Sequence, residues 1–160
     1  MGRQPGSSSI VRIDEIGPGG THLAFAAMRA LRPSLADEES FARWVDDVQR
    51  PEGYRLVGVF DDIRDDESAA AVAGFRLGHN LAWRRFLYVD DLSTLEHARR
   101  RGYARALLEW LFAEARRRRC DEVHLDSGVG LHRADAHRLY LNAGMVISSH
   151  HFARVLSPAK

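Results

Sequence analysis

Cysteine is almost absent from this sequence of 160 residues, since Cys120 is the single example. An internal disulfide and a zinc site built from several cysteines are therefore excluded. Long apolar runs are missing too. No segment approaches the ~20 apolar residues of a membrane-spanning helix, and residues 1–9 lack the apolar stretch of a secretory signal. We expect a cytoplasmic protein that does not bind membranes.

The chain also lacks a strong net charge. Lys and Arg total 23 and Asp and Glu total 22, which leaves a net charge of +1 and argues against a nucleic-acid partner. The eight histidines do not form a recognisable metal-binding pattern. His132 and His137 are five residues apart, and His150 and His151 are adjacent, so neither pair has the i, i+4 spacing of helical zinc ligands. We therefore expect no metal site.

Length and composition fit one compact domain, because 45% of the residues are hydrophobic and 28% are charged. We expect residues 1–9 to form a flexible tail and residues 10–160 to form the single domain. Apolar runs and alternation predict strands at 10–16, 54–60, 70–77, 83–95, 122–126, 145–148 and 151–156. Helical spacing predicts helices at 21–31, from Ser34 or Asp37 to about Gln49, at 102–119 and at 132–143.

This element order predicts an α/β (α+β) fold, in which about seven strands in the order β-α-α-β-β-β-α-β-α-β-β form a mixed sheet covered by helices. The acidic segment 61–67 separates two strands and is typical of a hairpin turn. In the second helix, four apolar residues define the face that we expect to be buried: Phe41, Trp44, Val45 and Val48.

The segment Arg99-Arg100-Arg101-Gly102-Tyr103-Ala104 joins a predicted strand to an amphipathic helix. Arginines at a helix start oppose the macrodipole, at a cost of up to ~1 kcal/mol each, unless a bound anion reverses the sign. Gly102 allows a positive φ or a close approach of the backbone, so a phosphate fits this loop. A solvated helix end is the alternative. The run Arg116–Arg119 at the other end of the helix needs no ligand, because cations there complement the dipole.

The pattern Arg99-x-x-Gly102-x-Ala104 resembles the acetyl-CoA-binding signature Q/R-x-x-G-x-G/A of the GNAT superfamily of N-acetyltransferases. Residues 136–145, AHRLYLNAGM, are similar to the second segment of that family, A-x-x-x-Y-x-x-x-G-F. The likeness covers residues 10 to 156 approximately. It implies a mostly antiparallel sheet that splays between its central strands, with helices on both faces, and an acetyl-CoA-dependent enzyme.

The resemblance also implies roles for individual residues. Backbone N–H groups from Arg100 to Arg105 would hold the pyrophosphate, and the N–H of Leu92 would polarise the thioester carbonyl. The implied cofactor-binding residues are Leu92, Ser93, Thr94, Arg99, Arg100, Arg101, Gly102, Tyr103, Ala104, Arg105 and Arg133. Arg133 stands where the family often has Asn. Tyr140 would donate a proton to the departing sulfur; an ordinary aromatic at the edge of the core is the alternative reading of its helical spacing.

Asp90 and Asp91 are the candidate bases, because a primary amine with a pKa of about 10 must lose a proton before it attacks a thioester. Strand alternation places Asp90 on one face with Tyr88 and Leu92, and Asp91 on the other, unless a bulge resets the register. We favour Asp90. Alternatively, the two carboxylates hold Arg84 or Arg85, or attract a cationic substrate.

The acceptor is the least defined part of this interpretation. Residues 32–67 contain eleven acidic residues and five arginines, a balance of 5 − 11 = −6, which favours a small cationic amine or a lysine side chain. A solvated acidic turn is the alternative explanation. We therefore predict acetyl transfer from acetyl-CoA to a primary amine by direct attack in a ternary complex, with a catalytically silent CoA-binding sensor or interaction module as the alternative. The C-terminal strands could pair two copies into a homodimer.

Overall fold

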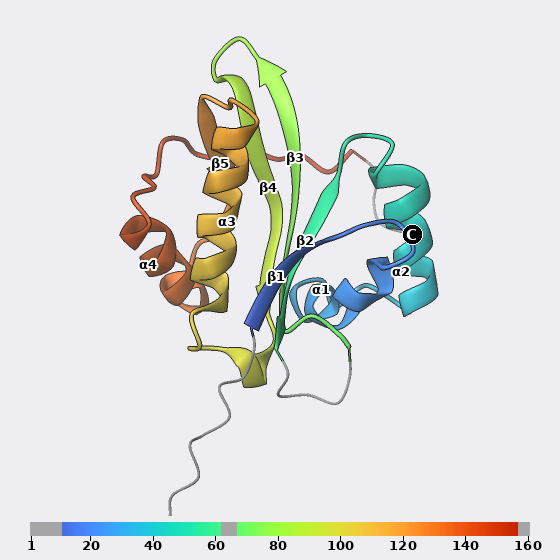
Figure 1. Ribbon diagram of the computed structural model, residues 1–160. Coiled ribbons are helices and arrows are strands. Elements are labelled where there is room, and N and C mark those ends of the chain that lie inside the picture. Colours follow the sequence, from blue (N-terminus) through green and yellow to red (C-terminus); the bar gives the residue numbers. More distant parts are fainter. Residues whose placement is uncertain (1–10, 62–66, 157–160) are drawn as a thin grey trace, which may run out of the picture. The chain divides into compact units, whose positions relative to one another are not determined.

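The computed structural model describes residues 11–61 and 67–156 (Figure 1). These residues fall into two compact units, which meet in the sequence between Leu125 and Asp126. The predicted tail and most of the acidic turn lie outside the described residues. No helix among the described residues combines the length and the apolar character needed to cross a bilayer.

The first unit is built on a mixed, mostly antiparallel sheet (Figure 1). Its strands, in spatial order, are β1 (Val11–Ile16), β2 (Arg55–Asp61), β3 (Ala71–Asn80), β4 (Arg84–Thr94) and β5 (Glu122–Leu125). The first three pairings are antiparallel and the β4–β5 pairing is parallel. The antiparallel pairing of β2 with β3 confirms the predicted hairpin.

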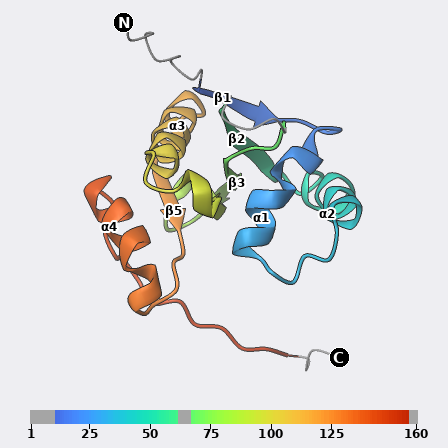
Figure 2. The same cartoon turned by 90° about the horizontal axis from the view of Figure 1, so that it is seen from below.

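Helices cover both faces of this sheet (Figure 2). On one face lie α1 (Phe25–Leu31) and α2 (Glu38–Trp44), and on the other lies α3 (Tyr103–Arg117). A π-helical turn, Val45–Gln49, continues α2. Asp37 caps α2, because its carboxylate accepts a hydrogen bond from the N–H of Ser40 at 2.8 Å.

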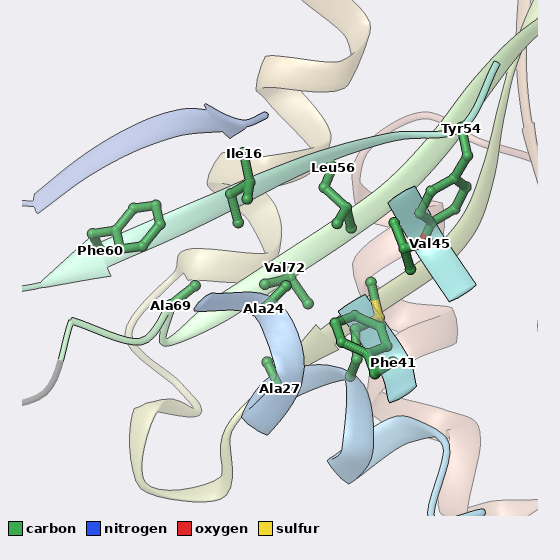
Figure 3. Packing of buried hydrophobic residues seen from close by; sticks show 11 residues of the cluster. Ile16, Ala24, Ala27, Phe41, Val45, Tyr54, Leu56, Phe60, Ala69 and Val72 are labelled. Atoms are coloured by element: carbon green, nitrogen blue, oxygen red, sulfur yellow. The ribbon is translucent and has the colours of Figure 1, made fainter. Parts of the chain in front are cut away.

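The core on the α1/α2 face gathers apolar side chains from both helices and from the first three strands (Figure 3). Phe41 and Val45 point into it, four residues apart on α2 and the π-helical turn. The prediction that Trp44 and Val48 share this buried face is wrong, since they are 60% and 37% exposed. At about 100° of rotation per residue, Trp44 lies at the border of the face led by Phe41. The π-helical turn Val45–Gln49 has more residues per turn than an α-helix, which rotates Val48 away from that face.

The opposite face of the sheet packs against α3. Leu107, Leu108 and Leu111 are fully buried, at the helical spacing seen in the sequence. Each fully buried leucine contributes about 1.5–3 kcal/mol relative to an exposed one. This packing holds α3 against the sheet and thereby fixes the position of its N-terminus, which matters for the site described below.

The second unit, Asp126–Lys160, is described over residues 126–156 and contains α4 (Ala134–Asn142), as the helical spacing predicts. A 3-10 turn, Leu131–Arg133, precedes this helix. The segments 145–148 and 151–156 are not strands, so the described residues contain five strands rather than seven. Alternating apolar residues set a pleat, but a strand also needs a neighbour for its backbone hydrogen bonds, and no ladder includes these segments.

Candidate functional site

The arginine-rich loop before α3 adopts a backbone that suits an anion. Arg100 and Gly102 both have positive φ, 62° and 83°. A positive φ is uncommon for arginine, and such strained residues cluster at functional sites. A Cβ built on Gly102 meets nothing within 4 Å, so the backbone conformation, and not crowding, requires glycine here.

The start of α3 presents backbone donors beside this loop. The N–H of Ala106 bonds to the carbonyl of Gly102 at 2.9 Å, which leaves the three preceding N–H groups, of residues 103–105, outside the hydrogen bonds of the helix itself. The first turn contains no acidic residue, and Gly102 has no side chain to cap it. Together with the positive end of the helix dipole, these donors form a site for a phosphate group.

Tyr103 anchors this helix start to the sheet. Its side chain is buried, and its hydroxyl donates to the carboxylate of Asp61, at the end of β2, at 2.8 Å. Burial and this hydrogen bond raise the pKa of Tyr103. The side chain therefore serves structure, and only the backbone of Tyr103 is available to a ligand.

The second half of β4 has an edge on which no strand of the described residues pairs. The pairing of β4 with β5 ends at Val89 and Leu125. Leu95 donates its N–H to the carbonyl of Ala70, next to β3, at 2.9 Å. Backbone N–H groups point alternately to the two edges of a strand, so the N–H of Leu92 points away from β3, and so does that of Thr94, while that of Ser93 points toward β3.

A β-bulge lies at Asp90 and decides which way the two acids face. Gly74 pairs with Asp91 and Phe75 pairs with Val89, so Asp90 is the extra residue. Tyr88 and Asp91 then share one face of the sheet, whereas Leu92 lies on the other with Val89. The expectation from simple alternation, that Tyr88, Asp90 and Leu92 share a face, is therefore wrong, because the bulge shifts the register by one residue.

Asp91 is fully engaged by its neighbours. Arg32, at the end of α1, donates from Nε and Nη2 to Oδ1 of Asp91 at 3.0 and 2.8 Å. The hydroxyl of Tyr54 donates to Oδ2 at 2.8 Å. Burial and the charge of Asp91 raise the pKa of Tyr54 far above its usual value, so this phenol stays a neutral donor. Asp91 acts here as a structural acceptor.

Asp90, in contrast, has one oxygen that no described residue engages. Nε of Arg76 donates to Oδ2 of Asp90 at 2.7 Å, and Oδ1 accepts no hydrogen bond from any described residue. Burial raises the pKa of Asp90, and the hydrogen bond and charge of Arg76 oppose that rise. The arginines that hold the two acids are thus Arg76 and Arg32, and not Arg84 or Arg85 as the sequence suggested.

Sequence reasoning missed these partners and one glycine. A Cβ on Gly74 would lie 1.8 Å from the hydroxyl oxygen of Tyr54, so only glycine lets that tyrosine reach Asp91. A glycine inside a strand pattern is a signal of a bulge or a close approach, and it could have indicated this site. No local pattern identifies Arg32, which lies 59 residues from Asp91.

The second unit brings together Tyr140 and Arg133. Tyr140 is half-buried on α4, and burial raises its pKa, while the charge and a hydrogen bond of Arg133 act in the opposite direction. The guanidinium of Arg133 also lies 3.2 Å from the hydroxyl of Ser127. Among the described residues, no three His, Cys, Asp or Glu side chains are grouped so that they could hold a metal ion.

Known proteins share this architecture. Residues 21–145 match the family model described as the acetyltransferase (GNAT) family. The chain is 28% identical over 132 residues to the uncharacterized N-acetyltransferase YhdJ of Bacillus subtilis, a match that covers 82% of this chain and 88% of that protein. In fold it is similar to an aminoglycoside N-acetyltransferase, AAC(6')-Iy, solved in complex with CoA, with a TM-score of 0.78, 12% identity and coverage of 96% and 100%. It is likewise similar to glucosamine-6-phosphate N-acetyltransferase from Arabidopsis thaliana, with a TM-score of 0.72, 13% identity and coverage of 92% and 99%.

Proposed function

Because this chain belongs to the GNAT family and is an acetyl-CoA-dependent acetyltransferase, we propose that it transfers the acetyl group to a primary amine by direct attack within a ternary complex. The observation that carries this proposal is the carboxylate of Asp90. It sits on a bulge of β4, two residues before the N–H of Leu92, and has one oxygen available.

The residues of the loop and of the α3 start fit the diphosphate of acetyl-CoA. The N–H groups of residues 103–105 would bind its oxygens, and the side chains of Arg99, Arg100 and Arg101 would supply positive charge. Arg105 contributes its backbone, since its side chain pairs with Glu109 at 3.0 Å. Acetyl-CoA supplies the acyl group in activated form, as a thioester.

The edge of β4 would hold the reacting end of acetyl-CoA. The N–H of Leu92 would donate to the thioester carbonyl, where negative charge grows during attack, and a preorganised donor of this kind is worth about 3 kcal/mol. The N–H of Thr94 points to the same edge and would pair with the pantetheine arm. Ser93 directs its N–H to β3, and in this proposal its backbone carries no such contact.

Two side chains would move protons. The free oxygen of Asp90 would accept the proton of the amine, directly or through one water, and such general base catalysis contributes about 10²–10⁴-fold. Tyr140 would return a proton to the departing sulfur. A phenol with an ordinary pKa of about 10 is protonated at neutral pH, so Tyr140 carries the proton that this step needs.

The test is release of free thiol from acetyl-CoA in the presence of a panel of amines. We expect amine-dependent release by the wild type and a loss of about 10²-fold in kcat for Asp90→Asn, with little change in the affinity for acetyl-CoA. Glu39→Gln, which removes an exposed carboxylate on α2, is the matched control and should leave kcat unchanged. Binding of acetyl-CoA without release of thiol for any amine would contradict the proposal.

A further inference from the structure

The two acids nearest the proposed reaction site are already paired with arginines. Each carboxylate at the bulge forms an ion pair: Asp90 with Arg76 at 2.7 Å and Asp91 with Arg32 at 2.8 Å. Several acids of the segment 32–67 are also engaged. Asp37 caps α2, Asp46 binds Arg50 at 2.7 Å, and Asp61 accepts the hydroxyl bond described above. The two acids and the two arginines at the bulge therefore balance in charge.

Within the described part of the chain, Arg76 keeps donors that are not used. Its Nε is spent on Asp90, and its guanidinium lies over the ring of Tyr54, 5.5 Å from the ring centre. Its side chain is 30% exposed, and no described residue accepts a hydrogen bond from either of its terminal nitrogens. The guanidinium is planar and carries five N–H groups in a fixed fork, which matches the two oxygens of a carboxylate.

The ion pair and the ring contact also hold this guanidinium in place. Because Asp90 engages Nε from one side and Tyr54 supports the plane, the edge with the two terminal nitrogens is preorganised for a second anion. A substrate anion at this edge would lie next to Asp90. Its amine could then reach the free Oδ1 of Asp90 only if few bonds separate the amine from the anion.

We propose that the acceptor is a small amino carboxylate, such as a free amino acid, whose carboxylate is bound by the terminal nitrogens of Arg76 while its amine faces Asp90. This inference rests on the proposed function and deepens it. The amine nitrogen forms a bond to the acetyl carbon as the bond from that carbon to sulfur breaks. The amine gives one proton to Asp90, and the CoA sulfur gains one proton. The substrate carboxylate is unchanged, so Arg76 selects the substrate without entering the chemistry.

The test compares matched acceptors in the thiol-release assay with the full chain. Each free amino acid of a panel is paired with its own amide, which keeps the side chain and the amine but removes the carboxylate charge. For the preferred amino acid, we expect kcat/KM to exceed that of its amide by about 10²-fold in the wild type, since a bidentate charge-assisted contact is lost. Equal values, or a preference for the amide, would overturn the inference while leaving amine acetylation established.

Variants test whether Arg76 is the source of the preference for the amino acid over its amide. Arg76→Met should bring the ratio of the two kcat/KM values close to one, whereas a merely structural loss would lower both values and keep their ratio. Arg43→Met, which removes an exposed arginine from α2, is the control and should keep the wild-type ratio. If Arg76→Met does not fold, Arg76→Lys keeps the charge without the fork and should reduce the ratio partially. Failure to acetylate any amine would refute the proposed function itself, so the two outcomes are distinct.

Discussion

Glu114 on α3 offers the sharpest test of how the site-bearing helix is held. It is 3% exposed and accepts hydrogen bonds at Oε1 from Arg55 at 2.7 Å and from Arg118 at 2.9 Å. Its Oε2 accepts from Nε of Arg117 at 2.9 Å. Arg55 lies on β2 and also binds Glu15 on β1 through two hydrogen bonds of 2.7 Å. The network therefore ties α3 to two strands, and part of the arginine run at the helix end binds this carboxylate in addition to complementing the dipole.

The contribution of Glu114 to the free energy of unfolding depends on how exposed its three arginine partners are. Removing one partner of a fully buried ion pair costs about 3–5 kcal/mol. The side chains of Arg117 and Arg118 are 58% and 51% exposed, so solvent screens their share, while that of Arg55 is only 20% exposed. Since Gln keeps the shape of Glu but not its charge, we expect Glu114→Gln to lower the free energy of unfolding by about 2 kcal/mol at pH 7.

The pH dependence of this stability difference is a second measurement of the same network. Burial alone would raise the pKa of Glu114, but hydrogen bonds from Arg118, Arg55 and Arg117 outweigh it and lower that pKa to about 2. The ordinary value in an unfolded chain is 4.5. A carboxyl with a depressed pKa in the folded state contributes stability that is complete above its unfolded pKa and declines as the pH falls through 4.5 toward 2. The difference between wild type and variant should therefore shrink as the pH falls below 4.5.

Urea unfolding followed by tryptophan fluorescence measures this difference, because Trp110 lies on α3 against Phe75. Glu109→Gln is the control on the same helix. Its ion pair with Arg105 is exposed, so we expect a change below about 0.5 kcal/mol. A variant at Glu114 as stable as the wild type at pH 7, or a difference that is constant between pH 7 and pH 3, would refute the reasoning.

Three further predictions concern the site. Gly102→Val should weaken CoA binding about tenfold or more, because a β-branched residue resists φ of 83°; calorimetry that finds wild-type affinity would discredit the phosphate loop. Gly74→Ala should drive Tyr54 from its place and lower the free energy of unfolding by about 1–3 kcal/mol, so an unchanged melting temperature would show that the strand yields instead. Tyr140→Phe should lower kcat with little effect on CoA affinity; unchanged turnover would remove Tyr140 from the mechanism.

Much of the local structure could be predicted from the sequence, because neighbouring residues decide it. Helical spacing located α3 and α4, and Asp37 is the cap of α2, as its position before that helix suggests. Gly102 indicated either a positive φ or a close approach of the backbone, and the structure shows the positive φ. Such features depend on the steric limits of single residues and on contacts within one turn.

The candidate site could be predicted from the sequence only in part. Asp90 and Asp91 were recognised as candidates, but their faces depend on a bulge, which arises only when β4 pairs with β3. Residues 145–148 and 151–156 resemble strands, yet no ladder of the described chain includes them. The spacing of apolar residues predicts a strand, but it does not show which other strand will pair with it.

The sequence by itself determined the helices, the β2–β3 hairpin and the arginine-rich loop with its glycine, since these need only short-range contacts. Tertiary structure alone decided that Arg32 and Tyr54 engage Asp91, and that the described residues leave one oxygen of Asp90 and the terminal nitrogens of Arg76 without a partner. The physical reason is distance along the chain: Arg32 meets Asp91 across 59 residues, and only folding brings such groups within hydrogen-bonding reach.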